Sequence, residues 1–200
     1  MDFINAYRYV IDRMKKELNP TLTYHNSDHT LDMHSSVIRL MDLENVTDAH
    51  TRMIMETAAI YHDCGMMISY SDHEDQSVFI AEKNLPSFGY SPVDICEVSK
   101  LILVTRLPQM PDNLPEKILC DADLDSLGRE DFFIRSFQLQ LEWELNGIRK
   151  TTLEEWLKFE EDFLENHHFF TDSARNLRDQ TKSNNLLNIK SLLNRINTNQ

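Results

Sequence analysis

The chain has 200 residues, which is enough for one domain with a substantial core and short for two. Its formal net charge is −13, and a surface that acidic repels phosphate backbones, so we do not expect it to bind nucleic acid. Four glycines and six prolines are few for a protein of many strands and turns, and they cannot form a glycine-rich phosphate loop. The composition therefore favours an all-α fold.

The cysteines and the apolar runs bear on the cellular location. The three cysteines form no C-x-x-C pair, which fits a reducing compartment better than a disulfide framework. The N-terminal residues lack the basic segment and apolar run of a signal peptide. Apolar runs elsewhere, such as residues 101–104, are far too short to cross a membrane. We therefore expect a cytoplasmic protein without a membrane partner.

Apolar residues recur at helical spacing along the N-terminal half, between short breaks. The first helix is expected over residues 3–18, because an Asn-Pro pair follows and proline disfavours helix at the residue before it. The second helix opens after Ser27. The third runs from about Thr47 to His62, with Gly65 as its C-terminal stop.

Capping patterns mark several of the later helices. Ser71 with Glu74 forms a capping-box pattern at the start of the fourth helix, and Ser91, followed by proline, starts the fifth. A proline-rich connector covers residues 108–115. Thr151 with Glu154 gives a further capping box. Four more helices are expected over residues 116–127, 130–146, 153–166 and 172–196. With no clear boundary along the chain, we predict a single multi-helix bundle over residues 1–200.

Two histidines end apolar stripes on two of these helices. His29 lies four residues before Met33, and His62 lies four residues after Ala58, so both share a face with apolar neighbours and point towards the interior. Asp63 follows His62 directly, about 100° further round a continuing helix. Two imidazoles and a carboxylate at buried helix ends need a partner.

A divalent cation is a natural partner for these groups. Neutral imidazole and carboxylate are ligands for zinc, manganese, iron and similar ions. Asp123 adds a carboxylate from a distant helix, so His29, His62, Asp63 and Asp123 make a four-ligand set with open positions for water and substrate. Such an ion lowers the pKa of bound water and polarises a phosphoryl oxygen. The plainer alternatives are a surface His-Asp pair, a core histidine and a solvated acidic turn.

The order H…HD…D resembles the HD superfamily of metal-dependent phosphohydrolases, which are all-helical proteins named for the His-Asp pair. The sequence YHNSDHTLD at residues 24–32 is similar to the YHNxxH signature of cyclic-nucleotide phosphodiesterases, a branch of that superfamily. The sequences AAIYHD at 58–63 and DADL at 121–124 resemble small bacterial predicted HD phosphohydrolases. The resemblance covers an HD core at about residues 7–129, and the helices over 130–196 complete the bundle.

The resemblance implies an enzyme that hydrolyses a small phosphate mono- or diester, such as a nucleotide. Water activated on the metal attacks phosphorus, and His25 protonates the leaving group. The implied metal ligands are His29, His62, Asp63 and Asp123, with Asp63 also part of the catalytic set. Asp123 is preferred over Asp121 as the ligand, and the choice between them stays open. The metal is Mn, Mg, Zn, Fe, Co or Ni.

Further residues are candidates for the same site. Glu74 is expected to position a water or hold a ligand histidine, and a capping role explains it equally well. His73 is a candidate ligand for a second metal. Asn26, Arg106 and Arg129 are expected to bind substrate, with an ordinary structural role as the alternative for both arginines. Two other functions stay open, a non-catalytic HD module that binds a nucleotide or signals, and a di-iron HD oxygenase, and so does a homodimer.

Overall fold

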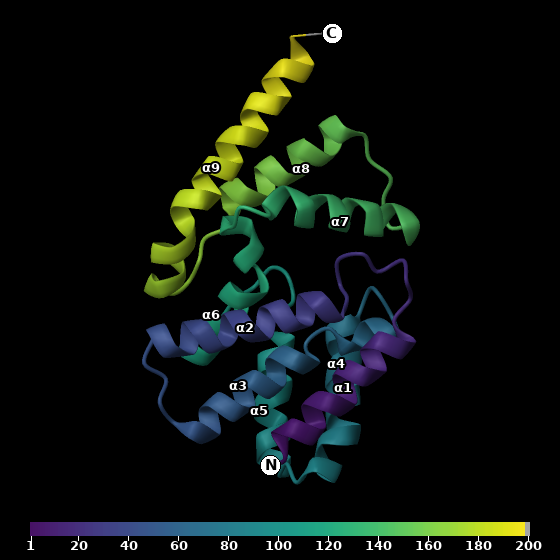
Figure 1. Ribbon diagram of the computed structural model, residues 1–200, viewed down its shortest axis with the longest axis vertical. Coiled ribbons are helices and arrows are strands. Elements are labelled where there is room, and N and C mark those ends of the chain that lie inside the picture. The colour runs from purple at the N-terminus through teal and green to yellow at the C-terminus, as the bar shows by residue number, and fades with distance from the viewer. Residues whose placement is uncertain (199–200) are drawn as a thin grey trace. The chain divides into compact units, whose positions relative to one another are not determined.

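The computed structural model describes residues 1–198, which form nine α-helices and three 3-10 helices and contain no strand (Figure 1). The all-α prediction is therefore confirmed. The elements in chain order are α1 (Phe3–Glu17), α2 (Ser27–Leu43), α3 (Ala49–Tyr61), η1 (Cys64–Met67), α4 (His73–Asn84), η2 (Leu85–Phe88), α5 (Pro92–Leu103), α6 (Leu114–Asp123), η3 (Asp125–Gly128), α7 (Phe132–Leu145), α8 (Leu153–Asn166) and α9 (Asp172–Asn197).

The chain divides into two compact units. Unit 1 comprises residues 1–20 and 25–123, and unit 2 comprises residues 21–24 and the chain from Leu124 onward. The boundary falls a few residues before the end of the HD core expected at residue 129. A single domain over residues 1–200 stays a prediction.

Helix α3 is the central element of unit 1. It packs against α1, α2 and α5, and α2 in turn packs against α6. The C-terminal half of α3 is buried almost all round, from Thr57 to Tyr61, with no exposed face. Because α2 begins, α3 ends and α6 ends in the same packed region, polar residues at these three helix ends are held close together.

Gly65 does not stop α3 as predicted. Helix α3 ends at Tyr61, and Gly65 lies inside η1, where the backbone comes very close to α4. A Cβ atom at this position would sit 2.0 Å from the His73 carbonyl oxygen and 2.6 Å from the Ser77 nitrogen. The Gly65 N–H also donates to Ser77 Oγ at 2.8 Å. Glycine is needed here for close packing, not for a left-handed turn.

The predicted helix boundaries agree with the structure at the start of α5 and differ at the start of α8 and the end of α6. Ser91 and Asp94 form the expected capping box of α5. The box predicted at residues 151 and 154 lies one residue later, at Thr152 and Glu155, where each side chain bonds the other residue's backbone N–H. The helix expected over 116–127 ends earlier, at Asp123, and a separate 3-10 turn follows it.

The capping box predicted for α4 is wrong. Helix α4 begins at His73, and its N-cap residue Asp72 makes no side-chain capping bond. Glu74, which the pattern assigned to the box, is instead buried and lies beside His73 and Arg106. Its carboxylate is therefore used by tertiary contacts.

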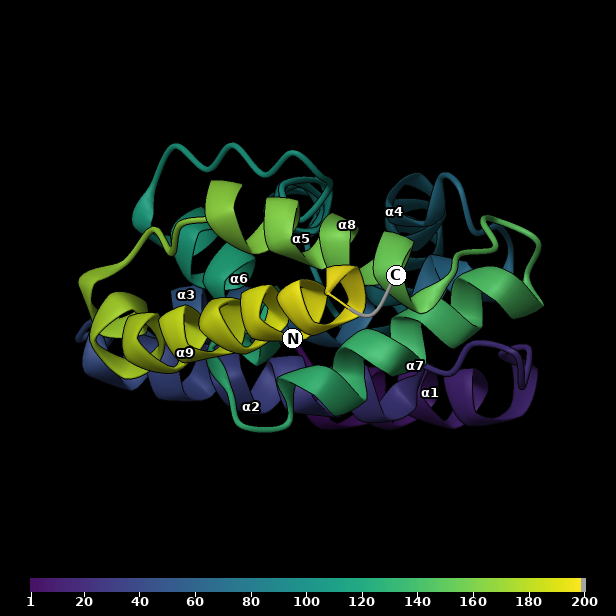
Figure 2. The ribbon, with the colours of Figure 1, turned by 90° about the horizontal axis from the view of Figure 1, so that it is seen from above.

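Unit 2 is built from η3, α7, α8 and α9, with α8 packed along α9 (Figure 2). Its core includes an aromatic cluster in which the rings of Trp143, Trp156 and Phe159 lie 5.1–5.3 Å apart. Residues 21–24 belong to this unit because the Tyr24 N–H donates to the buried Glu142 carboxylate at 2.8 Å. Among residues 1–198, no helix has both the length and the continuous apolar character that a bilayer span requires.

Candidate metal centre

The N-terminal turn of α2 fixes His29. Asn26 is the N-cap residue, and its Oδ1 accepts the backbone N–H groups of Asp28 at 2.9 Å and His29 at 3.2 Å. Such a cap contributes about 1 kcal/mol to helix stability and satisfies N–H groups that have no partner within the helix. His29 is 7% exposed, and its ring points into unit 1 with the apolar stripe of α2, as predicted.

The C-terminal end of α3 fixes His62 and its tautomer. The Nδ1–H of His62 donates to the Ala59 carbonyl oxygen at 2.8 Å, a carbonyl in the last turn of the helix. In the neutral ring this leaves Nε2 without a proton and free to accept one or to bind a metal. His62 is only 1% exposed, so its Nε2 depends on groups within the protein.

The predicted ligands converge on one point in unit 1. His29 Nε2 and His62 Nε2 are 3.3 Å apart, and Asp123 Oδ1 lies 3.3 Å from the first and 3.6 Å from the second. Ligand atoms of these three residues all lie within 4.8 Å of one another. Asp63 Oδ2 is 3.0 Å from His62 Nε2 and 3.4 Å from His29 Nε2. Asp121 is fully buried and is not a member of this group within the described chain.

The electrostatics of this cluster favour positive charge at its centre. Burial alone lowers the pKa of His62, but the nearby carboxylates of Asp63 and Asp123 raise it to about 9. Burial alone raises the pKa of Asp63, but His62, with His25 and His29, holds it well below its ordinary value. The carboxylates therefore favour a positive charge at the imidazoles, which a proton or a metal cation can supply.

The cluster fits a divalent cation. Asp63 Oδ2 is buried and has no hydrogen-bond partner, although two imidazole nitrogens lie within 3.4 Å of it. An unsatisfied buried carboxylate oxygen is costly, and a cation between it and the imidazoles removes that cost. Two ligands of one first-row ion, each at about 2.1 Å, lie roughly 3–3.5 Å apart, which is the spacing observed. His29, His62, Asp63 and Asp123 are the residues that could hold it.

A second imidazole faces the other oxygen of Asp63. His73 Nε2 lies 3.4 Å from Asp63 Oδ1 and 3.6 Å from Glu74 Oε1, while its Nδ1–H donates to the Tyr70 carbonyl oxygen. The unprotonated nitrogen of the neutral His73 ring therefore faces two carboxylates. Glu74 Oε2 is in turn 3.5 Å from Arg106 Nε. These contacts link the predicted catalytic Glu74 to the cluster through His73.

Gln109 contacts Asp123, and the sequence did not predict this contact. Its Nε2 donates to Asp123 Oδ2 at 3.1 Å and to the Thr105 carbonyl at 3.2 Å, so it fixes the Asp123 carboxylate with Oδ1 towards the histidines. Its own Oε1 is buried without a hydrogen-bond partner. Gln109 lies in the proline-rich connector, where no helical spacing or motif marks it.

His25 lies beside the cluster, near His29 and His73. The residue is half-buried, and its ring centroid is 6.0 Å from that of His29, 5.8 Å from that of His73 and 5.9 Å from that of Tyr70. It is close enough to act on a molecule held at the centre. Asn26 uses its side-chain oxygen to cap α2, and its contact with a substrate stays a prediction.

The two predicted substrate arginines lie in different units. Arg106 is in unit 1, where it pairs with Asp75 at 2.6 Å and lies near Glu74. Arg129 is in unit 2, where it pairs with Asp131 at 2.7 Å and lies 3.6 Å from Asp125. Both guanidinium groups are held by carboxylates, and their contact with a substrate phosphate stays a prediction.

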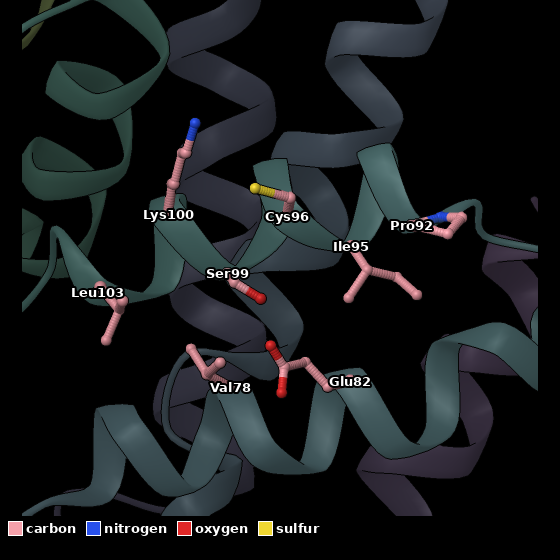
Figure 3. Close-up of a pocket in the computed structure, with 8 residues that line it drawn as sticks. All are labelled: Val78, Glu82, Pro92, Ile95, Cys96, Ser99, Lys100 and Leu103. Carbon is pink, nitrogen blue, oxygen red and sulfur yellow. The ribbon is translucent and has the colours of Figure 1, made fainter.

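A groove between α4 and α5 is separate from this cluster (Figure 3). It has a volume of about 500 Å³, and none of the predicted site residues lines it. Its walls are mainly apolar, with Val78, Ile95 and Leu103 among them.

No protein family model and no curated protein matches the chain, but solved structures do. A predicted HD superfamily hydrolase from an uncultured Thermotogales bacterium matches with a TM-score of 0.60 and 21% identity, covering 96% of this chain and 90% of that one. Bacillus subtilis YpgQ in complex with ADP matches with a TM-score of 0.66 and 21% identity, covering 96% and 95%. A second YpgQ structure matches at 0.65 and 20%, covering 98% of each chain.

This chain has the HD fold. The fold was predicted from the H…HD…D order, and the matches cover 96–98% of the chain, so they include the C-terminal helices outside the motifs. At 20–21% identity this likeness shows the fold alone.

Proposed function

We propose that this protein is a metal-dependent phosphohydrolase that acts on a small phosphate mono- or diester, a nucleotide in the first instance. The observation that carries the proposal is the convergence of His29, His62 and Asp123 within 4.8 Å, with the unsatisfied Asp63 Oδ2 beside both imidazoles. A divalent ion, when bound by these residues, lowers the pKa of a water and stabilises charge on phosphoryl oxygens.

The residues of the chain have separate roles in this proposal. Asn26 and the Ala59 carbonyl orient the two histidines, and Gln109 orients Asp123. His25 stands beside the cluster and donates a proton to the leaving oxygen, a role that suits a half-buried imidazole near neutral pH. Glu74, through His73, holds the Asp63 side of the centre in place.

The nucleotide class is supported by one comparison. YpgQ, which shares the HD fold with this chain, was solved in complex with ADP. The acidic surface does not oppose an anionic substrate here. Salt screens distant carboxylates, whereas a bound cation acts at contact distance.

The test is a substrate panel with the full chain loaded with Mn, Mg, Co or Zn. Nucleoside mono-, di- and triphosphates, cyclic nucleotides and sugar phosphates are each assayed for phosphate ester cleavage. We expect turnover of at least one nucleotide, and a rate below about 1% of wild type for Asp63→Ala, because the ligand set is broken. Asp94→Ala removes another buried aspartate, one that caps α5. It serves as the control and should keep the rate.

Two outcomes would contradict the proposal. Full activity in Asp63→Ala places the reaction at another centre. Stoichiometric metal binding without cleavage of any panel member favours the non-catalytic nucleotide-binding module instead.

A di-iron HD oxygenase is the second candidate. One observation favours it, since His73 Nε2 lies 3.4 Å from the Asp63 oxygen that faces away from His62, so Asp63 has an imidazole near each oxygen. A carboxylate in that position can bridge two ions. Two irons per chain together with oxygen consumption would select this candidate, and one metal per chain with phosphate release would select the first.

A further inference from the structure

The chain leaves unit 1 for four residues just before α2. Residues 21–24 belong to unit 2, whereas His25 and the residues that follow it belong to unit 1. This segment lies between the end of α1 at Glu17 and the start of α2 at Ser27, and its backbone is irregular. The polar groups of an irregular segment must find partners outside a helix, and those partners determine its course.

Helix α7 and the residue that ends it supply several of these partners. The Thr23 hydroxyl donates to the Gln138 carbonyl oxygen at 2.6 Å. The Thr21 hydroxyl donates to Asn146 Oδ1 at 2.8 Å, and Asn146 Nδ2 donates back to the Thr21 carbonyl oxygen at 3.3 Å. Asn146 is the C-cap residue of α7. Side chains and backbone of the segment are therefore attached to α7 at two separate places.

Glu142 makes the third attachment, and it is the most deeply buried. It lies four residues after Gln138 and four before Asn146, so the three residues form one row along the helix. Its side chain is fully buried, and its Oε2 accepts the Tyr24 backbone N–H at 2.8 Å. An acid is retained inside a protein only when hydrogen bonds compensate its desolvation, and a bond from a backbone N–H to a carboxylate is of the strong kind. Glu142 therefore fixes the backbone of Tyr24.

His25 follows directly, and its other neighbour is fixed as well. Asn26 is the N-cap residue of α2, where its side-chain oxygen accepts the N–H groups of Asp28 and His29 and its carbonyl oxygen accepts that of Thr30 at 3.1 Å. Peptide bonds are planar, so a residue between two hydrogen-bonded neighbours keeps few backbone conformations. The backbone position from which the His25 side chain starts is set from both sides.

The position of this imidazole matters because of what lies beside it. Its ring centroid is 6.0 Å from that of His29, a candidate metal ligand, and 5.8 Å from that of His73. A proton donor must come within hydrogen-bond distance of the leaving oxygen. A misplacement of about 1 Å can lower a rate by about a hundredfold. A ring at this place therefore works only if its backbone stays where it is.

We propose that Glu142 is a positioning residue for the proton donor, acting through the Tyr24 N–H, and that residues 21–24 transmit its effect to His25. The proposal rests on the proposed function. In that reaction the water oxygen bonds to phosphorus, the bond from phosphorus to the leaving oxygen breaks, and that oxygen keeps the electron pair and takes the proton of His25.

Nuclear Overhauser effects between ring protons of the full chain test the positioning without any substrate. In the wild type we expect effects from His25 to His29 and to Tyr70, whose ring centroids are 6.0 and 5.9 Å away. Glu142→Ala should reduce both at least twofold. Glu142→Gln keeps an oxygen that accepts the Tyr24 N–H and should retain them. Unchanged effects in Glu142→Ala overturn the proposal.

Two further variants separate positioning from a general loss of packing. Glu160→Ala removes another buried acid of unit 2, on α8, and should retain the effects. An equal loss in Glu160→Ala means that any damage to this core displaces His25, which also overturns the proposal. Thr23→Val removes the hydroxyl that donates to Gln138 and leaves the core intact, so it decides the question if Glu142→Ala does not fold. It should weaken the effects, and unchanged effects would contradict the proposal.

Hydrolysis of two aryl phosphates by the chain loaded with Mn²⁺ tests the link to proton donation. Phenolate is a more basic leaving group than 4-nitrophenolate and depends more on a proton donor. Glu142→Ala should therefore lower kcat at least tenfold for phenyl phosphate and less than twofold for 4-nitrophenyl phosphate, with KM unchanged. Equal losses for both esters overturn the proposal. A wild type that cleaves neither ester counts against the proposed function, and the Overhauser effects then decide the positioning alone.

Discussion

Both units bury acidic and histidine side chains, but the two units shift them in opposite directions. In unit 1, the carboxylates around His62 raise its pKa to about 9, and the imidazoles around Asp63 lower the pKa of that carboxyl. Each group there is held in its charged form by a neighbour of opposite charge.

In unit 2, burial dominates. Glu160 is 4% exposed, and burial raises its pKa to about 7, although the Ser136 hydroxyl that donates to it at 2.6 Å works against the rise. His167 is packed among aromatic rings, and burial, with Lys182 and His168 nearby, lowers its pKa to about 3. Both groups are held in their neutral forms.

The direction of these pKa shifts distinguishes a candidate site from polar groups that are simply buried in a core. Buried groups that point at one another and keep their charges create a place for an ion. Buried groups that lose their charges to desolvation only have to be packed. Residue type alone would not tell His62 from His167.

The largest expected effect concerns metal binding to unit 1. A divalent ion at about a thousand times its dissociation constant stabilises the folded chain by about 4.1 kcal/mol, a rise in the thermal midpoint of roughly 8–16 °C. His29→Ala should abolish this rise, whereas Glu160→Gln in unit 2 should keep it. Calorimetry with and without Mn²⁺ or Zn²⁺ measures both. An unchanged rise in His29→Ala would remove that histidine from the ligand set.

Glu160 should make unit 2 less stable as the pH rises. Its pKa is raised from 4.5 to about 7, so the folded state keeps a proton that the unfolded chain releases. The stabilisation is complete below pH 4.5 and is lost as the pH rises towards 7, at a cost of about 3 kcal/mol by pH 8. Glu160→Gln keeps the neutral shape and avoids this loss. Urea unfolding of both proteins at pH 5 and pH 8 should show a gap that appears only at the higher pH.

His167 should have the opposite dependence. Its pKa is lowered from 6.5 to about 3, so the unfolded chain takes up a proton that the folded chain excludes. Its contribution is complete above pH 6.5 and falls as the pH drops, by about 2 kcal/mol at pH 5. His167→Phe keeps a ring between Phe163 and Phe169 and removes the titration. If the wild type and His167→Phe lose equal stability between pH 7 and pH 5, the ring is not buried as described.

Gln109 offers the smallest and most specific effect. Replacing its amide by an apolar group in Gln109→Leu frees the Asp123 carboxylate to rotate. Loss of such an outer contact typically weakens metal binding by about tenfold or more. Isothermal titration with Mn²⁺ measures the change, with Gln180→Leu on α9 as the control. Wild-type affinity in Gln109→Leu would show that Asp123 needs no support.

The sequence predicted the parts of this molecule that follow helical spacing. His29 and His62 share faces with apolar residues, so their inward direction and the all-α fold could be inferred before any coordinates. Gln109 could not be inferred, because it lies in an irregular connector and acts through a contact across fourteen residues. Gly65 was misread, because sequence shows that a glycine is present but not which backbone approaches it.

Gly65 sets a distance as well as a packing contact. Its bare Cα lets the turn after the His-Asp pair lie directly on the first turn of α4, which carries His73. Any larger residue would push that helix outward and widen the gap between Asp63 and His73. Gly65 therefore controls the size of the ion or molecule that fits between those two side chains, although it has no side chain that could bind one.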